Sequence, residues 1–359
     1  MQFLELTDSE FEEFAQNHPR ANFNQTLSMK KVRENLGLQT KLLGIKDDSD
    51  SDEKIVAAAL VVIINSRIKS AGIYYGPLID FANKELLDFW TQNLKKYLSN
   101  LGVVYCSMNP NFVYAVHDND GSIIDSAHKA DKEFQNLIDL GYLHNGWTMI
   151  GTDASNRWHY LKDLQLYFGS ATDADYEELI MSFRSTTRQR IRKYKKNNLT
   201  VKELSGSDID IFLKLLSDSA EKHGFTPRDK NYFESLIKHF SHDGHLKLLC
   251  AFTEDNIPIS ASLFIIYAGV CVYFHSGNDV RYIKLLGSYA LQDYMFKYCL
   301  ENKIPVYNFL GFDAVFDKPN GVLDFKRGFK GYIEELPGSF ELPINSFKYK
   351  IYSILKKRF

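Results

Sequence analysis

The fold is decided by two stretches of sequence, TKLLGIKDDSDSDEKIVAAALVVII at residues 40–64 and LKLLCAFTEDNIPISASLFII at residues 246–266. Each has a short apolar segment, an acidic turn and a longer apolar segment, a pattern typical of a β-hairpin. The first turn, Asp47–Glu53, is longer and more charged than the second. We therefore predict two hairpins of the same kind, one in each half of the chain.

The similarity between the two halves continues beyond the hairpins. In each half a strand with paired aromatic residues, an amphipathic helix and a further strand follow in this order. The first copy has Tyr74-Tyr75, Glu85–Leu98 and GVVYCSM at 102–108, and the second has Tyr273-Phe274, Gly287–Glu301 and PVYNFLGF at 305–312. Chance likeness between short apolar runs is the alternative. The shared order predicts a duplicated α/β unit, and 359 residues suit two domains.

The composition is that of a globular protein and excludes several classes of function. The 26 Phe and 21 Tyr supply apolar surface for a core. The chain has 43 Lys+Arg and 45 Asp+Glu, so a globally basic nucleic-acid-binding surface is excluded, whereas a local basic patch is not. The four cysteines form no CxxC pair, which excludes a common zinc framework and favours reduced thiols.

The two ends of the chain bear on its location. The N-terminal MQFLELTDSEFEEF is acidic and lacks the apolar region of a signal peptide. No apolar run reaches the roughly 18 residues of a membrane-spanning helix. We therefore expect a cytoplasmic protein. The last segment, SFKYKIYSILKKRF at 346–359, predicts a short basic amphipathic helix that leaves contact with a membrane surface open.

A strongly basic segment lies between the two copies. Thr172-Asp-Ala-Asp175 fits a capping box, and no Pro or Gly interrupts Tyr176 to Asn197, so we predict one helix there. Its second half, FRSTTRQRIRKYKKNN, holds seven cations and no acid. Arg184, Arg188 and Arg192 recur at four-residue spacing and share a helix face. Seven unpaired cations favour an anionic ligand, namely tRNA, a phospholipid headgroup or a diphosphate, over a merely solvated face.

Two shorter segments are further candidates for binding or chemistry. In HGFTPRDKNYF, residues 223–233, Arg228 and Tyr232 are four apart and could present a guanidinium and a phenol together. Pro227 also makes this segment an ordinary helix start. In GVLDFKRGFKGY, residues 321–332, three cations crowd between glycines that let the backbone approach a ligand closely. A surface hairpin is the alternative there.

Several motifs of known chemistry are absent from the sequence. His239, His242 and His245 are three apart, but no HExxH or nearby cysteine supports a metal site, so a surface turn is the better interpretation. The chain has no P-loop, no GxGxxG and no GxSxG nucleophile elbow. We expect no metal.

Taken together, these segments resemble the Fem family of peptidoglycan-bridge aminoacyltransferases over almost the whole chain. The resemblance rests on the order of FNQTLSMKKVRENLG, YYGPLID, RQRIRKYKKNNLTVKEL, HGFTPRDKNYF, ISASLFII, GSYALQDYMFKYCL, YNFLGF and VLDFKRGFKGYIEE. It implies an α/β (α+β) fold of two tandem GNAT-like acyltransferase domains, which agrees with the repeat. The first would comprise 1–160 plus the C-terminal helix 340–359 and bind the precursor. The second, 161–339, would carry the basic helix and the transfer site.

The resemblance also implies a reaction and its partners. An aminoacyl-tRNA would donate a small amino acid, Ala, Ser or Gly, to the side-chain amine of the stem-peptide lysine of UDP-MurNAc-pentapeptide or lipid II. No cofactor is needed beyond this donor. We expect a cytoplasmic monomer with peripheral contact to the inner membrane surface. The alternatives are an acetyl-CoA-dependent N-acetyltransferase, although RYIKLLGSYA lacks the spacing of a pyrophosphate loop, and a non-enzymatic RNA- or membrane-binding module.

Site residues follow from the resemblance, position by position. The lysine that contacts the precursor's diphosphate matches Lys31, with Lys30 and Arg33 as rivals. The other implied precursor contacts are Arg228, Tyr232, Tyr273, Tyr75 and Asn109. The Phe-Lys pair that handles the tRNA end and the transfer matches Phe325-Lys326, and these two are the expected catalytic residues. For the tRNA backbone we expect Arg188, Arg192 and Lys195.

The sequence departs from the family pattern in three places. Asn109-Pro110 stands where Asp-Pro is common, so a carboxylate base is missing at that position. YNFLGF replaces a YDFGG-like segment, and only FTEDNIP stands where some members insert a coiled-coil arm. We therefore expect an armless member. The general base is not assigned, although Asp313, Asp317 and Asp324 lie near the loop in sequence.

Overall fold

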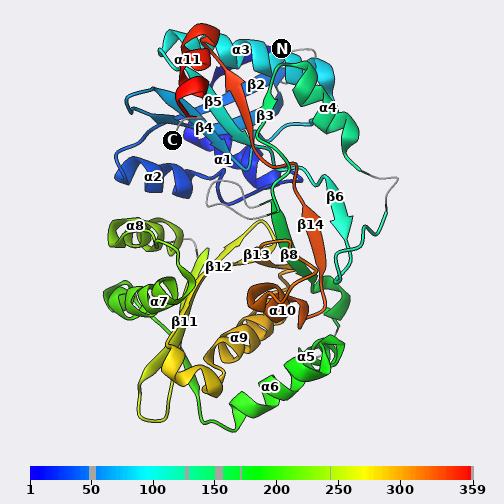
Figure 1. Cartoon of the computed structure of the whole chain (residues 1–359), viewed down its shortest axis with the longest axis vertical. Coiled ribbons are helices and arrows are strands. Elements are labelled where there is room, and N and C mark those ends of the chain that lie inside the picture. The colour runs from blue at the N-terminus through cyan, green and yellow to red at the C-terminus, as the bar shows by residue number, and fades with distance from the viewer. Residues whose placement is uncertain (48–53, 126–128, 150–156, 170–171, 243, 357–359) are drawn as a thin grey trace. The chain divides into compact units, whose positions relative to one another are not determined.

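The chain forms two compact units that exchange segments along the sequence. The computed structural model describes residues 1–47, 54–125, 129–149, 157–169, 172–242 and 244–356. Unit 1 comprises Met1–Val116, Ile123–Arg157 and Glu334–Phe359, and unit 2 comprises His117–Ser122 and Trp158–Ile333 (Figure 1). The short segment 117–122 thus belongs to unit 2, whereas the sequence-based division placed it in the first domain.

Unit 1 is built on a seven-stranded sheet with the order β1-β2-β3-β4-β5-β15-β7. Its first elements are β1 (Gln2–Glu5), α1 (Asp8–Asn17), α2 (Leu27–Asn35), β2 (Gln39–Asp47), β3 (Lys54–Ile64), β4 (Ser70–Tyr74), α3 (Lys84–Asn100) and β5 (Tyr105–Asn109). Later in the chain come β6 (Ala115–His117), α4 (Asp131–Asp139), β7 (Leu143–His144), β15 (Phe340–Pro343) and α11 (Ser346–Lys356). Strand β6 pairs in the other sheet.

The central strand β3 is covered on both faces, which explains its almost continuous apolar sequence. Its alternate residues Ala57, Ala59, Val61 and Ile63 share a core cluster with α3. Helix α3 begins where the Asn83 side chain accepts a hydrogen bond from the backbone amide of Leu86 at 3.1 Å. Helices α1 and α2 contact β3 and β2, on the opposite side of the sheet from α3 (Figure 1).

Unit 2 is built on an eight-stranded sheet with the order β6-β14-β8-β13-β12-β11-β10-β9. Its strands are β8 (Trp158–Asp163), β9 (Thr200–Glu203), β10 (Leu246–Phe252), β11 (Pro258–Tyr267), β12 (Val270–Asn278), β13 (Val306–Gly311) and β14 (Tyr332–Glu335). Its helices are α5 (Thr172–Ser182), α6 (Ser185–Lys195), α7 (Ile209–His223), α8 (Lys230–Phe240), α9 (Gly287–Glu301) and α10 (Gly321–Arg327), with short 3₁₀ turns at Gln165–Tyr167, Gly206–Asp208 and Val280–Leu285. One core cluster joins α5, α6, α9 and α10, while α7 packs on β12 and β11.

The same order of elements occurs in both units. Unit 1 runs β1-α1-α2-β2-β3-β4-α3-β5, and unit 2 runs β9-α7-α8-β10-β11-β12-α9-β13. In each, the hairpin strands pair antiparallel and the strand after the long helix pairs parallel. Both predicted hairpins are confirmed, and residues 48–53 of the first turn lie outside the described part. The repeat extends further than the sequence revealed, because β1 and β9 are short strands with little apolar pattern.

The basic segment is two helices rather than the single helix that the sequence predicted. Helix α5 ends at Ser182 and α6 begins at Ser185. Phe183 between them is buried in the core, and the amide of Arg184 donates to the carbonyl of Gly328 at 2.9 Å. Tertiary contacts, which no local pattern records, therefore end the first helix. The expected capping box rests on Thr172, whose side chain lies outside the described residues.

Three other local expectations can be compared with the structure. Pro227 is not inside a helix, because Asp229 caps α8 through the amide of Tyr232 at 2.9 Å. The segment after Asn320 is the helix α10 and not a hairpin, with Asn320 as its N-cap. The C-terminal helix is confirmed over Ser346–Lys356, and residues 357–359 lie outside the described part. Among the described residues, no helix combines the length and hydropathy that crossing a membrane requires.

Candidate functional site

In unit 1, two predicted precursor-binding residues lie at the carboxyl ends of the paired strands β4 and β5. Strands β4 and β5 are parallel and stay paired to their last residues, Tyr74 opposite Asn109. Tyr75 follows directly with φ of 52°, and the amide of Gly76 donates to the carbonyl of Asn109 at 3.1 Å. Asn109 is buried, and burial raises the pKa of Tyr75. The structure therefore brings Tyr75 and Asn109 together.

Helix α2 carries the three cations among which the diphosphate contact was sought. Lys30 lies 3.3 Å from Glu34 and 3.7 Å from Asp8, so its charge is already paired. The guanidinium of Arg33 lies over the ring of Tyr74, 4.9 Å from its centroid. Lys31 is exposed and makes no ion pair with any described residue. Of the three, Lys31 is the exposed cation that has no ion pair with a described residue, while Arg33 is half-buried against Tyr74.

Unit 2 differs from unit 1 at the corresponding pair of parallel strands. Strand β12 pairs with β13 only from Val270 to Val272, while its other edge stays paired with β11 up to Asn278. The β11 pairing shifts register by one residue at Phe274, because Leu263 lies opposite His275 and Phe264 lies opposite Tyr273. Among the described strands, none pairs with this edge of β12 beyond Val272. The backbone from Tyr273 onward is thus open on one side.

Lys326 of α10 is the most perturbed basic group of unit 2. Its side chain is only 4% exposed, and its Nζ donates to the carbonyl of Leu310 at 3.1 Å and to that of Gly311. These carbonyls belong to the end of β13, the strand that leaves β12. Burial lowers the pKa of Lys326 to about 7. Both the ammonium and the free amine are therefore available near neutral pH.

Aromatic contacts connect Phe325, the residue before Lys326, with Tyr273 of β12. Phe325 packs against Tyr289 with ring centroids 5.1 Å apart and against Phe329 at 5.3 Å. Phe309 of β13 lies 6.5 Å from Phe325 and 6.3 Å from Tyr273. Burial raises the pKa of Tyr273. The expected transfer pair and the expected pocket tyrosine thus all contact β13.

Arg228 and Tyr232 also face β12, as their spacing predicted. The Arg228 guanidinium lies 5.8 Å from the centroid of the Tyr232 ring, although Arg228 precedes α8 instead of lying on it. Tyr232 is nearly buried, and its ring lies 6.4 Å from that of His275. Burial, followed by the charge of Arg228, lowers the pKa of His275 to about 4. The sequence analysis missed His275, whose only signal is its place two residues after Tyr273.

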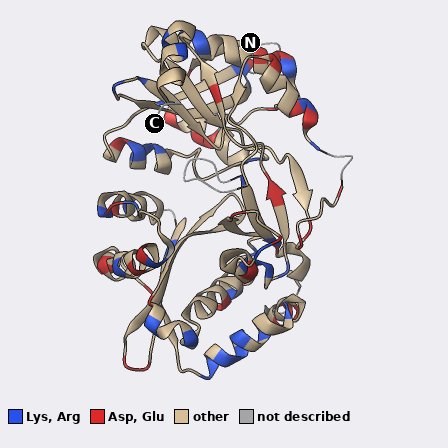
Figure 2. Ribbon diagram, in the orientation of Figure 1, with Lys and Arg blue, Asp and Glu red and all other residues tan. Residues whose placement is uncertain are grey.

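Lys and Arg positions follow one another along helix α6 (Figure 2), but several of these cations already have partners. Arg188 donates to the carbonyls of Met181 at 2.9 Å and Phe183 at 2.8 Å, at the end of α5. Lys195 donates to the Tyr176 hydroxyl at 3.1 Å and lies 3.7 Å from Asp293. The expectation of seven unpaired cations is therefore wrong, because partners from distant segments pair with several of them. The exposed cations without a described partner are Arg192, Lys193 and Lys196.

A buried carboxylate fixes the position of α6. Asp293 of α9 is 2% exposed and accepts hydrogen bonds from the hydroxyls of Tyr176 on α5 and Tyr194 on α6. One side chain thus joins three helices. The sequence analysis missed Asp293 because its partners are about 100 residues away.

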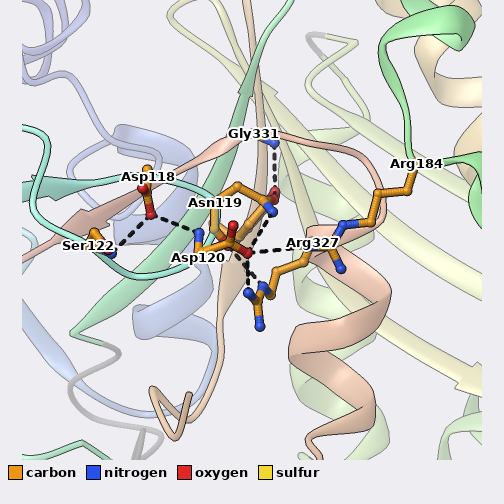
Figure 3. A network of polar contacts seen from close by, with 8 residues as sticks. Asp118, Asn119, Asp120, Ser122, Arg184, Arg327 and Gly331 are labelled. Atoms are coloured by element: carbon orange, nitrogen blue, oxygen red, sulfur yellow. Dashed lines mark hydrogen bonds and ion pairs between the residues drawn. The ribbon is translucent and has the colours of Figure 1, made fainter. Parts of the chain in front are cut away.

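A second polar network reaches the end of α10 (Figure 3). Asp120 accepts from Arg327 and from Arg184 at 3.3 Å, and Arg327 also donates to the carbonyl of Asn119 at 2.9 Å. The amides of Asp120 and Ser122 donate to the carboxylate of Asp118 at 2.8 and 2.9 Å. This network connects segment 117–122 with Arg327, the residue after Lys326, and with the start of α6.

Other candidates lie elsewhere or are exposed. Asp313, Asp317 and Asp324 all have exposed side chains, unlike the buried Lys326 amine, so their burial singles out none of them as the base. A cavity of about 360 Å³ in unit 2 is lined by Ser205, Ser241, Lys247 and their neighbours and includes none of the predicted site residues. Within the described part of the chain, no three His, Cys, Asp or Glu side chains are placed to hold a metal ion.

The two repeated units define a tandem GNAT-like fold, the architecture of acyltransferases. The structure is similar to that of a tandem GNAT protein from the clavulanic acid biosynthesis pathway, with a TM-score of 0.57 and 9% identity. The match covers 96% of this chain and 98% of that chain. The crystal structure of FemX is more similar, with a TM-score of 0.81 and 19% identity over 98% of this chain and 99% of that chain. Both comparisons concern the fold.

Sequence comparison extends the fold assignment to a family. The model of the FemAB family matches residues 6–254 and 247–357. Aminoacyltransferase FemB of Staphylococcus epidermidis is 28% identical over 426 residues, covering 99% of this chain and 98% of that protein. Aminoacyltransferase FemA of the same species is 27% identical over 427 residues, covering 99% of each. The chain belongs to the FemAB family.

The link between β10 and β11 is short, and no long helical arm follows β10 in the described part of the chain. The alignment with FemB is longer than the whole of this chain, so that relative carries inserted residues that are absent here. Only residues 253–257 separate β10 from β11. The expected armless architecture with two GNAT-like units is therefore confirmed.

Proposed function

We propose that this protein transfers a small amino acid, Ala, Ser or Gly, from an aminoacyl-tRNA to the side-chain amine of the stem-peptide lysine of a peptidoglycan precursor. The proposal is carried by Lys326, a buried amine with a pKa of about 7 at the end of β13, in a chain of the FemAB family. The relatives FemA and FemB are named aminoacyltransferases.

The reaction is the aminolysis of an ester. The amine nitrogen of the acceptor attacks the ester carbonyl carbon, an amide bond forms, and the bond to the ribose oxygen breaks. That oxygen finally receives the proton that the amine loses. Because the ester is the more reactive species, holding both substrates in line supplies most of the catalysis. Unlike a hydrolase, this reaction needs no nucleophilic residue in the protein.

Lys326 is suited to stabilise negative charge that develops on the ester oxygen. Its ammonium form is buried, and a charge interacts more strongly there than in water. Phe325, the other expected catalytic residue, is held by Tyr289 and Phe329 and would support the end of the donor. The acceptor amine has an ordinary pKa of about 10.4 and must lose a proton, which desolvation in the pocket favours.

The remaining expected residues take binding roles in this proposal. Lys31 and Arg228 would contact the precursor's diphosphate, since a guanidinium fork suits such an anion. Tyr232, Tyr273, Tyr75 and Asn109 would contact the rest of the precursor. On α6, Arg192 would contact the tRNA backbone directly. Arg188 and Lys195 would also contact the tRNA backbone, while keeping the hydrogen bonds that they make within the protein. The donor serves without a cofactor, and the enzyme would act as a cytoplasmic monomer.

A transfer assay tests the proposal. Purified protein is incubated with tRNA charged with labelled Gly, Ala or Ser, and with UDP-MurNAc-pentapeptide or lipid II. We expect label on the stem-peptide lysine with one of these pairings. A parallel reaction with labelled acetyl-CoA tests the acetyltransferase alternative. Acetylation instead of aminoacyl transfer, or no transfer with intact charged tRNA and folded protein, would overturn the proposal.

A further inference from the structure

Helix α11 presents an apolar face to solvent. Phe347 is 74% exposed, and Ile351, Ile354 and Leu355 are each 46–49% exposed. At 3.6 residues per turn these four side chains fall within an arc of about 100°. Four large apolar residues on three turns form a stripe, whereas isolated exposed apolar side chains are ordinary.

The opposite face of the same helix is already packed on unit 1. Tyr352 stacks on Tyr105 of β5 with ring centroids 4.7 Å apart, and the two hydroxyls are hydrogen-bonded at 3.1 Å. The Tyr349 hydroxyl donates to the carboxylate of Glu341 at 2.6 Å. The helix is therefore anchored by its tyrosines, and the exposed stripe is not needed to hold it in place.

Charge identifies what would cover the stripe. Lys348 and Lys350 flank it, one on each edge of the apolar arc. Residues 346–359 contain five cations and no acid. An apolar stripe between lysines is the pattern of helices that lie in the interface of an anionic bilayer. A second copy of this helix is a poorer partner, because two such faces would bring like charges together.

We propose that the outward face of α11 docks this protein on a membrane surface that contains anionic phospholipids. Phe347, Ile351, Ile354 and Leu355 enter the headgroup region, and Lys348 and Lys350 contact lipid phosphates. Binding at this face is independent of catalysis. Its consequence, preferential use of a lipid-linked acceptor, rests on the proposed function.

The experiment is cosedimentation of the full-length protein with vesicles of phosphatidylcholine, with and without phosphatidylglycerol. We expect binding to the anionic vesicles that falls as salt is raised. Phe347→Ser/Ile351→Ser should weaken this binding by about tenfold or more. Lys348→Gln/Lys350→Gln should weaken it by a similar factor on anionic vesicles alone. Leu166→Ser, at a residue of unit 2 that is 76% exposed, is the matched control and should bind like the parent protein.

Three results would overturn the proposal. The first is a parent protein that does not bind anionic vesicles, and the second is a Phe347→Ser/Ile351→Ser variant that binds as well as the parent. The third is sedimentation velocity showing a lipid-free dimer that Phe347→Ser/Ile351→Ser dissociates, since a second copy would then cover the stripe. Because vesicle binding requires no transfer, failure of the proposed reaction leaves this test unaffected. Circular dichroism checks that each variant is folded.

Discussion

Lys326 combines burial, hydrogen bonds to the backbone and a lowered pKa in one side chain of unit 2. Its amine is surrounded by protein, it donates to the carbonyls at the end of β13, and burial lowers its pKa to about 7. A lysine buried without a carboxylate partner costs stability, so an arrangement of this kind is more often found at functional sites than in cores. The side chain that the family resemblance selected is thus also the one that physical chemistry selects.

Replacing Lys326 by Met separates turnover from binding. The apolar side chain fills similar space but removes the charge, so we expect turnover to fall by about 100-fold. The dissociation constant of the precursor should change by less than about threefold. Steady-state kinetics and calorimetric titration of the precursor measure the two effects. Lys318→Met, at an exposed lysine in the segment between β13 and α10, is the control. A variant that weakened only precursor binding would contradict the assigned role.

The lowered pKa of Lys326 also predicts a pH dependence of stability. Between pH 7 and about 10.4 the unfolded chain holds a proton on Lys326 that the folded protein tends to release. The cost of burying the charge is therefore fully present below pH 7 and is lost as the pH rises through this window. We expect the free energy of unfolding of the parent, relative to Lys326→Met, to rise by up to about 1.4 kcal/mol per pH unit. Urea denaturation between pH 7 and 9.5 measures this difference, and a flat difference would contradict it.

Arg228 tests the precursor pocket. Its guanidinium is exposed above Tyr232, so Arg228→Ala removes a charge without disturbing the core. We expect about a tenfold weaker affinity for the precursor, in line with a charge-assisted hydrogen bond of about 1.5–3 kcal/mol. Arg192→Ala, which removes an exposed cation of α6, should leave precursor affinity unchanged. If both substitutions weakened precursor binding equally, a specific contact between Arg228 and the precursor would be contradicted.

The sequence could supply some of these residues and not others. Arg228 and Tyr232 are four apart, and their side chains do meet. His275, Asp120 and Asp293 act through partners brought by other strands and helices, so no spacing marks them. The same long-range pairing made the expectation of seven free cations wrong.

At the scale of elements, the contact between α6 and α10 is fixed by a glycine. The amide of Arg184 donates to the carbonyl of Gly328, just before α6 begins. A Cβ at Gly328 would lie 2.3 Å from Oγ1 of Thr187, a buried side chain of α6. The break between α5 and α6 is part of this contact. A local pattern without Pro or Gly could not reveal it, whereas the strong hairpin and helix periodicities of both repeats were readable.

Gly328→Ala should therefore destabilise unit 2 by about 1–3 kcal/mol, the usual cost of overpacking. Thr187→Ala alone should cost less, because it removes only a small side chain. The double variant Gly328→Ala/Thr187→Ala should recover part of the loss, since the shortest contact is then removed and the Phe325 carbonyl, 3.0 Å from the new Cβ, remains. Urea denaturation of the three variants gives the coupling energy. Additive effects would show that the two residues do not press on each other.

At the scale of the molecule, the duplicated units have diverged at the same pair of strands. In unit 1 the parallel strands β4 and β5 remain paired to Tyr74 and Asn109, whereas in unit 2 β12 and β13 separate after Val272. The buried lysine lies at the separated pair. The sequence predicted the repeat but not this difference. Both copies carry a pair of aromatic residues at this place, so the pattern does not show that the strands separate in only one of them.

The whole molecule has a net charge of only -2, so its overall field does not attract tRNA. Binding must then come from local cations, and those of this segment that are exposed and have no described partner are Arg192 and Lys193 of α6 and Lys196 just after it. Their replacement by Ala should reduce the slope of log affinity against log salt concentration by about 2–3, one counterion release for each lost phosphate contact. The triple variant Lys54→Ala/Lys96→Ala/Lys132→Ala removes the same charge from exposed positions of unit 1 and should leave the slope unchanged. Filter binding of charged tRNA at several salt concentrations measures both variants. Equal changes in slope would mean that net charge, and not the surface of α6, governs the interaction.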